Sequence, residues 1–116
     1  MSNEITIFER ILKGEIPAKK IYEDEYTFAV HDISPQAPVH VLVIPKTKIA
    51  NVGDAQDQHA ELLGRILLAA AHVAKLLDIE KSGYRLVFNN GNNGGQTVPY
   101  LHCHVMGGRA MQWPPG

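Results

Sequence analysis

The sequence predicts an α+β domain, in which an antiparallel sheet of about five strands is combined with one short and one long helix. Two observations support this. Short apolar runs typical of strands follow one another closely, separated by turn-forming residues. A single long stretch with apolar residues at a helical period is inserted among them. Successive strands with an inserted helix favour an antiparallel sheet, and we expect the helices to cover one side of it.

Length and composition fit one ordinary domain, which we place over residues 1–116. Of the 116 residues, 45% are hydrophobic and 20% are charged, which is enough to build one core. The formal net charge is −1 without a basic run, so neither a nucleic-acid polymer nor a membrane is an expected partner. The single Cys103, together with an N-terminus unlike a signal peptide, predicts a cytoplasmic protein.

The first third of the chain predicts a helix followed by a hairpin. Apolar residues recur at a helical period over residues 5–12. Residues 20–23 and 26–31 have strand character, with a tight turn expected between them. Residues 32–38 hold two prolines and a serine, so a loop is expected there.

The middle of the chain predicts a central strand and the long helix. Residues 39–44 are mainly apolar on both faces, which is typical of a strand covered on both sides. A helix is expected to begin at Asp54 as its N-cap and to end at residues 81–83. A further strand is expected over residues 84–89. The predicted buried stripe of the helix consists of Leu62, Ile66, Ala70, Val73 and Leu77.

The stretch from Thr97 to Arg109 carries the strongest functional signal. In an extended chain alternate side chains share a face, so Tyr100, His102 and His104 are expected to lie together. His40 is likewise an exception on an apolar strand surface. Neutral imidazole suits nucleophilic and acid–base chemistry near pH 7, although strand histidines also occur as purely structural residues.

Two further interpretations remain open at this point. A His-x-His pair on a strand is also half of a zinc site, for which His40 would offer a third nitrogen, whereas Cys103 points to the opposite face. The loop over residues 89–97 is rich in Gly and Asn. Such loops tolerate left-handed backbone, and their successive N–H groups form anion-binding concavities.

Five segments together carry a resemblance to a known family: Ile16–Lys19, His31–Pro38, His40–Lys46, Gly94–Arg109 and Trp113–Gly116. They resemble the histidine triad (HIT) family, and within it the Hint branch of nucleotide-binding proteins that hydrolyse purine nucleoside phosphoramidates. The resemblance covers nearly the whole chain in order, as a single HIT domain.

The resemblance implies roles for four residues around a phosphate. His102 would be the nucleophile that attacks the α-phosphate of an AMP- or GMP-type substrate and forms a nucleotidyl-histidine intermediate. His104 would contact the phosphate and the leaving group, and His40 would complete the site. Asp32 would hold the ribose hydroxyls through its carboxylate.

The resemblance also implies the surroundings of these residues. It implies a homodimer in which two sheets join into one, with Trp113 in a tail that reaches the partner's site. It implies no metal and no cofactor. The phosphate-side contacts would be Asn89, Gly95, Gln96 and Thr97. The apolar slot for the purine would be formed by Ile7, Phe8, Ile11, Ile16 and Ile33.

One position departs from the family pattern, because Tyr100 stands where the first triad histidine is found. Tyrosine ordinarily titrates near pH 10 and offers one hydroxyl in place of two ring nitrogens. If this position supplies only its backbone carbonyl, catalysis tolerates the change. If its ring takes part in proton transfer, the alternative is a nucleotide-binding or interaction module with weak catalysis.

Overall fold

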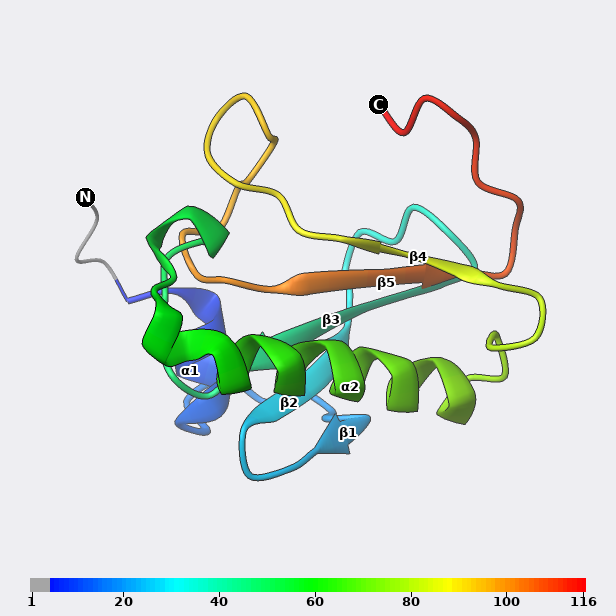
Figure 1. Cartoon of the computed structure of the whole chain (residues 1–116). Coiled ribbons are helices and arrows are strands. Elements are labelled where there is room, and N and C mark those ends of the chain that lie inside the picture. The colour runs from blue at the N-terminus through cyan, green and yellow to red at the C-terminus, as the bar shows by residue number, and fades with distance from the viewer. Residues whose placement is uncertain (1–4) are drawn as a thin grey trace.

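The computed structural model describes residues 5–116 and confirms an α+β fold built on one antiparallel sheet (Figure 1). The strands are β1 (Tyr22–Glu23), β2 (Thr27–His31), β3 (Val39–Pro45), β4 (Tyr84–Val87) and β5 (Cys103–Gly107). The helices are α1 (Ile7–Leu12) and α2 (Ala60–Leu76), and two 3₁₀ turns, η1 (Val52–Asp54) and η2 (Asp57–His59), precede α2. None of the helices within residues 5–116 is long and apolar enough to cross a membrane.

The sheet has the order β1-β2-β3-β5-β4, and all of its neighbouring strands are antiparallel. The predicted hairpin is confirmed as β1 and β2. The predicted central strand is confirmed as β3, which pairs with β2 on one side and β5 on the other. Pairing of β3 with β5 brings Leu42 opposite His104 and His40 opposite Met106. Segments more than 60 residues apart in the chain thus meet at the middle of the sheet.

Helix α2 covers one face of the sheet and forms the larger core. Ile66, Ala70 and Val73 are fully buried, as the predicted stripe requires. They pack against Cys103 and Val105 of β5 and against Leu101, which precedes this strand. Alternate residues of the chain near β5 therefore enter this core.

Helix α1 packs on the opposite face, so the expectation that both helices cover one side is wrong. Phe8 and Ile11 form a second cluster with Leu42 of β3 and with Tyr100, which lies in the segment before β5. The helix is fixed at its start by a capping box, in which Thr6 and Glu9 satisfy each other's backbone N–H. Because this helix has only six residues, it leaves part of the second face uncovered.

The start of the long helix also differs from the prediction. Asp54 ends a 3₁₀ turn and is not the N-cap of the long helix. Its own N–H is capped by the side chain of Asn51. The backbone at Ala55 and Gln56 is extended, which prevents continuous helix from Asp54 onward. Helix α2 ends at Leu76, before the expected residues, and Asp78 follows with a left-handed φ of 59°.

Candidate active site

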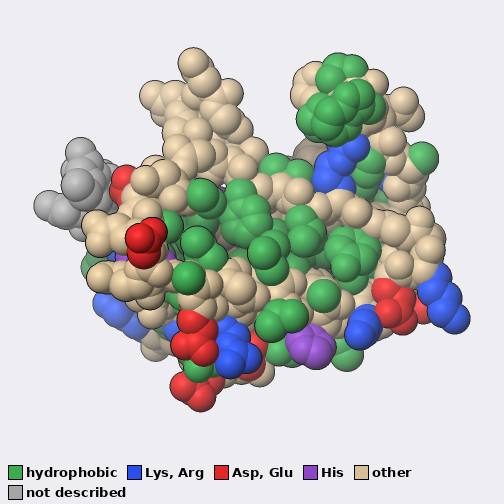
Figure 2. Space-filling model, viewed as in Figure 1, with side chains coloured by type: hydrophobic (Ala, Val, Ile, Leu, Met, Phe, Trp, Pro, Cys, Tyr) green, Lys and Arg blue, Asp and Glu red, His purple; other side chains and the backbone are tan. Residues whose placement is uncertain are grey.

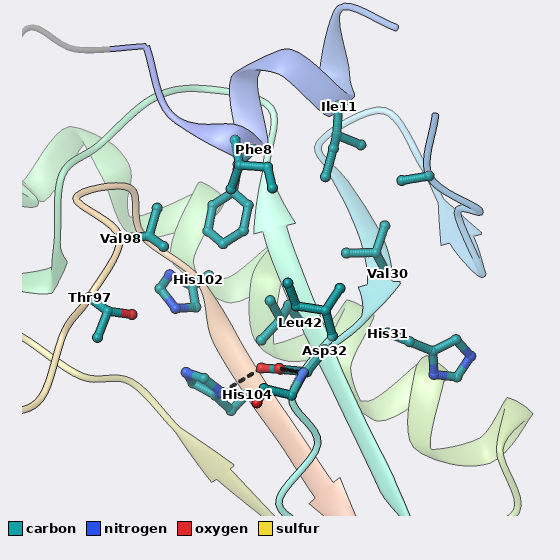
Figure 3. A pocket seen from close by; sticks show the side chains of 14 residues that line it. Phe8, Ile11, Val30, His31, Asp32, Leu42, Thr97, Val98, His102 and His104 are labelled. Carbon is teal, nitrogen blue, oxygen red and sulfur yellow. Dashed lines mark hydrogen bonds and ion pairs between the residues drawn. The ribbon is translucent and has the colours of Figure 1, made fainter. Parts of the chain in front are cut away.

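A cavity of about 320 Å³ opens between α1 and the uncovered part of the sheet (Figure 3). Much of its apolar wall comes from α1 and the neighbouring strands. Its polar end comes from the end of β2 and the loop after it, and from β5 and the segment before it. The apolar lining is Ile7, Phe8, Ile11, Ala18, Val30, Ile33, Leu42 and Val98. The polar lining is His31, Asp32, Ser34, Thr97, His102 and His104.

His102 is oriented by the backbone directly before it. It is buried, precedes β5 and makes a 2.7 Å hydrogen bond from Nδ1 to the carbonyl oxygen of Tyr100. A carbonyl can only accept, so Nδ1 carries the proton and Nε2 has a free lone pair. The ring edge of Phe8, 5.0 Å away between centroids, holds the imidazole from the other side. Burial lowers the pKa of His102, although the Tyr100 hydrogen bond and the Asp32 charge act in the opposite direction. The lowered pKa keeps the ring neutral at pH 7.

His40 and His104 form a hydrogen-bonded pair beside it, with Nε2 of His40 2.9 Å from Nδ1 of His104. The backbone N–H of Gln36 donates to Nδ1 of His40 at 3.0 Å, so that nitrogen carries no proton. The proton of neutral His40 is therefore on Nε2, and it is donated to His104. Nε2 of His104 consequently carries the second proton of the pair. The two cavity histidines are thus opposite in kind, because His102 has a lone pair on Nε2 and His104 has a proton there.

Charges around the pair reinforce this arrangement. Oδ2 of Asp32 lies 3.4 Å from Nε2 of His40 and 4.0 Å from Nδ1 of His104. Its other oxygen accepts a hydrogen bond from the backbone N–H of Ser34 at 2.7 Å. Burial, together with the neighbouring His102 and His40, lowers the pKa of His104 to about 4, although the charge of Asp32 opposes the shift. At pH 7 His104 is therefore a neutral hydrogen-bond donor.

Tyr100 contributes its backbone, and its side chain belongs to the core. The ring is 1% exposed, packs edge-on against Phe8 at 5.9 Å, and its hydroxyl donates to the carbonyl oxygen of Pro45 at 2.6 Å. Burial, with a contribution from Glu9, raises the pKa of Tyr100 to about 12. A hydroxyl that is neutral, buried and already bonded does not exchange protons with the cavity.

The Gly- and Asn-rich loop is held in shape by Gln96. Its amide nitrogen donates to the carbonyl oxygens of Ala50 and Val98, and its oxygen accepts from the N–H of Gly91. The loop itself requires glycine. Gly95 has a φ of +82°, and a Cβ at Gly94 would lie 2.5 Å from the carbonyl oxygen of Asn90.

The structure brings together eight of the predicted site residues at the cavity, and it places the others around it. His40 is buried behind His104. Ile16 packs at the edge of the cluster formed by α1 rather than in the cavity lining. Trp113 is 83% exposed in the C-terminal tail. Asn89, Gly95 and Gln96 belong to the loop and are not in the lining. The residues that line the cavity are Ile7, Phe8, Ile11, Asp32, Ile33, Thr97, His102 and His104.

Sequence reasoning missed two kinds of contributor. Leu42 and Val30 line the apolar wall, and the strand period could have identified Leu42 because it shares a face with His40. The N–H of Gln36, which determines the proton positions, left no signal because every residue except proline has that group. His31 lies at the rim, where Figure 3 shows its ring turned away from the other histidines.

The metal interpretation of the sequence included His102, His104 and His40. Within residues 5–116, the group of ligand atoms that lie within 4.8 Å of one another consists of Asp32, His40 and His104, without His102. The 2.9 Å contact between the two imidazoles holds a proton, so an ion would have to displace that proton and break the hydrogen bond. The arrangement present is that of a hydrogen-bonded pair.

Comparison with known proteins agrees with this fold. The HIT domain model matches residues 13–111, and the chain belongs to the HIT family. A 14 kDa zinc-binding protein of Zea mays is 49% identical over 113 residues, which cover 96% of this chain and 88% of that protein.

Solved structures of HIT proteins have the same fold as this chain. The crystal structure of a HIT family hydrolase from Legionella pneumophila has a TM-score of 0.93 and 47% identity, and covers 97% of this chain and 100% of that one. A histidine triad nucleotide-binding protein from Candida albicans has a TM-score of 0.80 and 33% identity, with 95% and 83% covered.

Proposed function

We propose that this protein is a hydrolase of purine nucleoside 5′-phosphoramidates of the Hint branch, acting through a nucleotidyl intermediate on His102. The observation that carries the proposal is the fixed pair of opposite imidazoles. His102 presents a lone pair and His104 a proton donor, with ring centroids 5.0 Å apart at one cavity. Neighbours named as a hydrolase and as a nucleotide-binding protein support the class of substrate.

The cavity suits a nucleoside monophosphate. The apolar wall around Phe8 and Ile11 would hold the purine, and the Asp32 carboxylate would accept hydrogen bonds from the ribose hydroxyls. Thr97, at the polar end beside the histidines, would bind phosphoryl oxygens together with backbone N–H groups of the adjoining loop. A cavity of this size accommodates one nucleotide, and its apolar wall discriminates weakly between adenine and guanine.

The reaction would proceed in two balanced steps. An anionic phosphoryl group raises the pKa of a nearby imidazole, so His104 would take up one proton on Nδ1 with the substrate. Its hydrogen bond from His40 would then give way to an ion pair with Oδ2 of Asp32, which lies 4.0 Å from that nitrogen. Nε2 of His102 attacks phosphorus, the P–N bond breaks with its electron pair on nitrogen, and His104 protonates the departing amine. Water then attacks the phosphorus of the intermediate, gives its proton to His104, and releases the nucleoside monophosphate and neutral His102.

The direct test is release of AMP from an adenosine 5′-phosphoramidate by the wild type and by His102→Ala. We expect turnover to fall to background in the variant, while its far-UV circular dichroism stays unchanged. His72→Ala is the matched control, because His72 is an exposed histidine of α2 remote from the cavity lining. Unchanged turnover in His102→Ala would contradict the mechanism.

A second candidate function is nucleotide binding with little catalysis, which is motivated by Tyr100 in place of a histidine. Calorimetry with AMP separates the two candidates when it is run beside the hydrolysis assay. Binding of AMP with background hydrolysis by the wild type would favour the binding module. Absence of both would reject the nucleotide site.

We also propose that the protein is a homodimer in which β4 pairs with β4 of a second copy to continue the sheet. Strand β4 is an edge of the sheet, and exposed apolar side chains lie on it and on α2. Figure 2 shows hydrophobic side chains gathered across the face that carries these elements. The exposed large apolar residues of these two elements are Leu67, Leu68, Leu76 and Tyr84. Light scattering during size-exclusion chromatography should give twice the chain mass, and a monomer would reject the proposal.

A further inference from the structure

Two residues of the loop between β2 and β3 fix the ring of His40. Asp32 and Gln36 follow β2, and the carboxylate of the first lies near Nε2 while the N–H of the second donates to Nδ1. An acceptor on one nitrogen and a donor on the other permit only one neutral tautomer. The position of the Gln36 N–H therefore determines where the protons of the His40–His104 pair lie.

Arg109 holds that loop from outside the cavity. Its Nε and Nη2 donate to the carbonyl oxygen of Gln36 at 3.2 and 3.0 Å. The contact is between residues 73 positions apart, and Figure 1 shows the β2–β3 loop meeting the end of β5 there. Gly108, with a φ of +87°, makes the turn that directs the chain across; a Cβ there would lie 2.9 Å from Pro38. Two donors from one cationic group on a single carbonyl give a strong, directional contact.

The contacts form a continuous series from the surface to the cavity. Arg109 bonds the carbonyl of Gln36, whose N–H bonds His40, whose Nε2–H bonds His104. His40 and His104 have roles in the proposed mechanism, and Gln36 bonds directly to His40. Arg109 has no role in it. Arg109 is exposed and is not one of the residues that line the cavity.

We propose that Arg109 is a positioning residue, which acts through Gln36 to keep a proton on Nε2 of His104. If the loop shifted, His40 would lose its donor at Nδ1, and the tautomer with a proton there would become accessible. His104 would then donate from Nδ1 and turn a lone pair toward the phosphoryl group, where it repels the anion and protonates no leaving group. This inference rests on the proposed hydrolysis for its catalytic consequence, but not for its effect on the tautomers.

Two substrates separate positioning of the acid from general damage. An alkylamine phosphoramidate of AMP requires protonation of its leaving nitrogen, whereas the 4-nitrophenyl ester of AMP releases a phenolate that leaves without a proton. We expect Arg109→Ala to lower kcat for the alkylamine substrate about tenfold, part of the roughly 10²- to 10⁴-fold that a positioned acid contributes. The kcat for the ester and both KM values should stay at wild-type levels, and Arg109→Lys should recover part of the loss.

Arg85→Ala is the matched control. Arg85 lines the same surface cavity as Arg109 and also donates to a backbone carbonyl, that of Gln112 at 2.8 Å. Arg85→Ala removes one positive charge from the same neighbourhood without touching Gln36. Because Arg85 lies on β4, its variant is compared with the wild type at the same oligomeric state. The ratio of the kcat values for the two substrates should then stay at the wild-type value. An equal loss on both substrates in Arg109→Ala, or the same selective loss in Arg85→Ala, would overturn the proposal.

A measurement without substrate makes the proposal independent of the hydrolytic activity. Long-range ¹H–¹⁵N correlation spectra of the histidine rings distinguish an Nδ1–H from an Nε2–H tautomer. We expect His40 and His104 of the wild type to show protonated Nε2, and Arg109→Ala to show a mixture of tautomers. Unchanged tautomers in Arg109→Ala would overturn the positioning role. If the wild type hydrolyses neither substrate, the proposed function fails, and these spectra still decide the role of Arg109.

Discussion

The two faces of one stretch of chain, residues 100–105, lie in different environments. Leu101, Cys103 and Val105 enter the core under α2, where each is 1% exposed or less. The backbone of Cys103 and Val105 pairs within the sheet. The backbone N–H of Leu101 donates to the carbonyl oxygen of Ile49. The opposite face carries His102 and His104 beside the cavity.

The difference lies in what covers each face. The 17 residues of α2 exclude water from the first, whereas the six residues of α1 leave the second partly open. Hydrogen bonds replace close packing on the open face, and each of its imidazoles has one nitrogen bonded to protein. Substitutions on the closed face should therefore change stability, and substitutions on the open face should change turnover.

The largest contrast is expected between two neighbours, Leu101 and His102. Leu101→Ala should lower the free energy of unfolding by about 2–5 kcal/mol, since it leaves a cavity in a packed core, with little effect on kcat. His102→Ala should lower turnover by about 10³-fold or more, the order expected for loss of a nucleophile, with a small change in stability. Chemical denaturation and AMP release measure the two. Equal effects of both variants on stability would contradict the separation of the faces.

The next largest effect is expected at His104, the proton donor. His104→Ala should lower kcat for an alkylamine phosphoramidate by roughly 10²-fold, the lower range for a general acid. The loss should be smaller for a 4-nitrophenyl ester, whose leaving group needs no proton. Steady-state kinetics with both substrates test this. An equal loss on the two substrates would assign His104 to binding rather than to proton transfer.

Tyr100 should affect stability more than catalysis, although it lies on the open face. Tyr100→Phe leaves the Pro45 carbonyl without its donor and should cost about 1–3 kcal/mol of unfolding free energy, with turnover near wild type. Tyr100→His keeps the backbone carbonyl that orients His102 and should also leave turnover near wild type. A clear gain of turnover in Tyr100→His would show that a ring nitrogen is needed at the first triad position.

The pH dependence should show a displaced acidic limb. His102 must be neutral to attack, so activity is lost as pH falls through its pKa in the free enzyme. Because burial lowers that pKa, kcat/KM should remain high below pH 6.5, the ordinary histidine value, and fall only at more acidic pH. A stopped assay between pH 4 and 8 measures it. A midpoint at or above the ordinary value would contradict the buried, neutral nucleophile.

The smallest effect is expected from removal of metal ions. The proposed steps use imidazoles, Asp32, Thr97 and backbone donors, so dialysis against a chelator should leave kcat unchanged. Because a relative carries the name of a zinc-binding protein, added zinc is the informative complement. Zinc that displaces the proton between His40 and His104 should inhibit hydrolysis. Loss of activity on chelation, restored by stoichiometric zinc, would instead establish a metal-dependent reaction.

The local pattern of the chain was sufficient for the sheet and for part of the site. Period-two alternation placed His102 and His104 on one face and Cys103 on the other, because side-chain direction in extended backbone depends only on position. The continuous apolar run over residues 39–44 was sufficient to place that strand at the centre. Glycine at residues 94 and 95 likewise reflects backbone that other residues adopt at a cost.

Tertiary structure alone decided which atoms carry protons and which face each helix covers. The tautomer of His40 depends on the N–H of Gln36, and the loop that bears it is held by Arg109 from the far end of β5. Backbone N–H groups are the same in nearly every residue, so no residue type identifies the one that donates. Placement of α1 opposite α2 depends on which sheet face remains to be covered. Sequence determined the residue types and their periodicity, and non-local packing selected the proton positions on which the proposed chemistry depends.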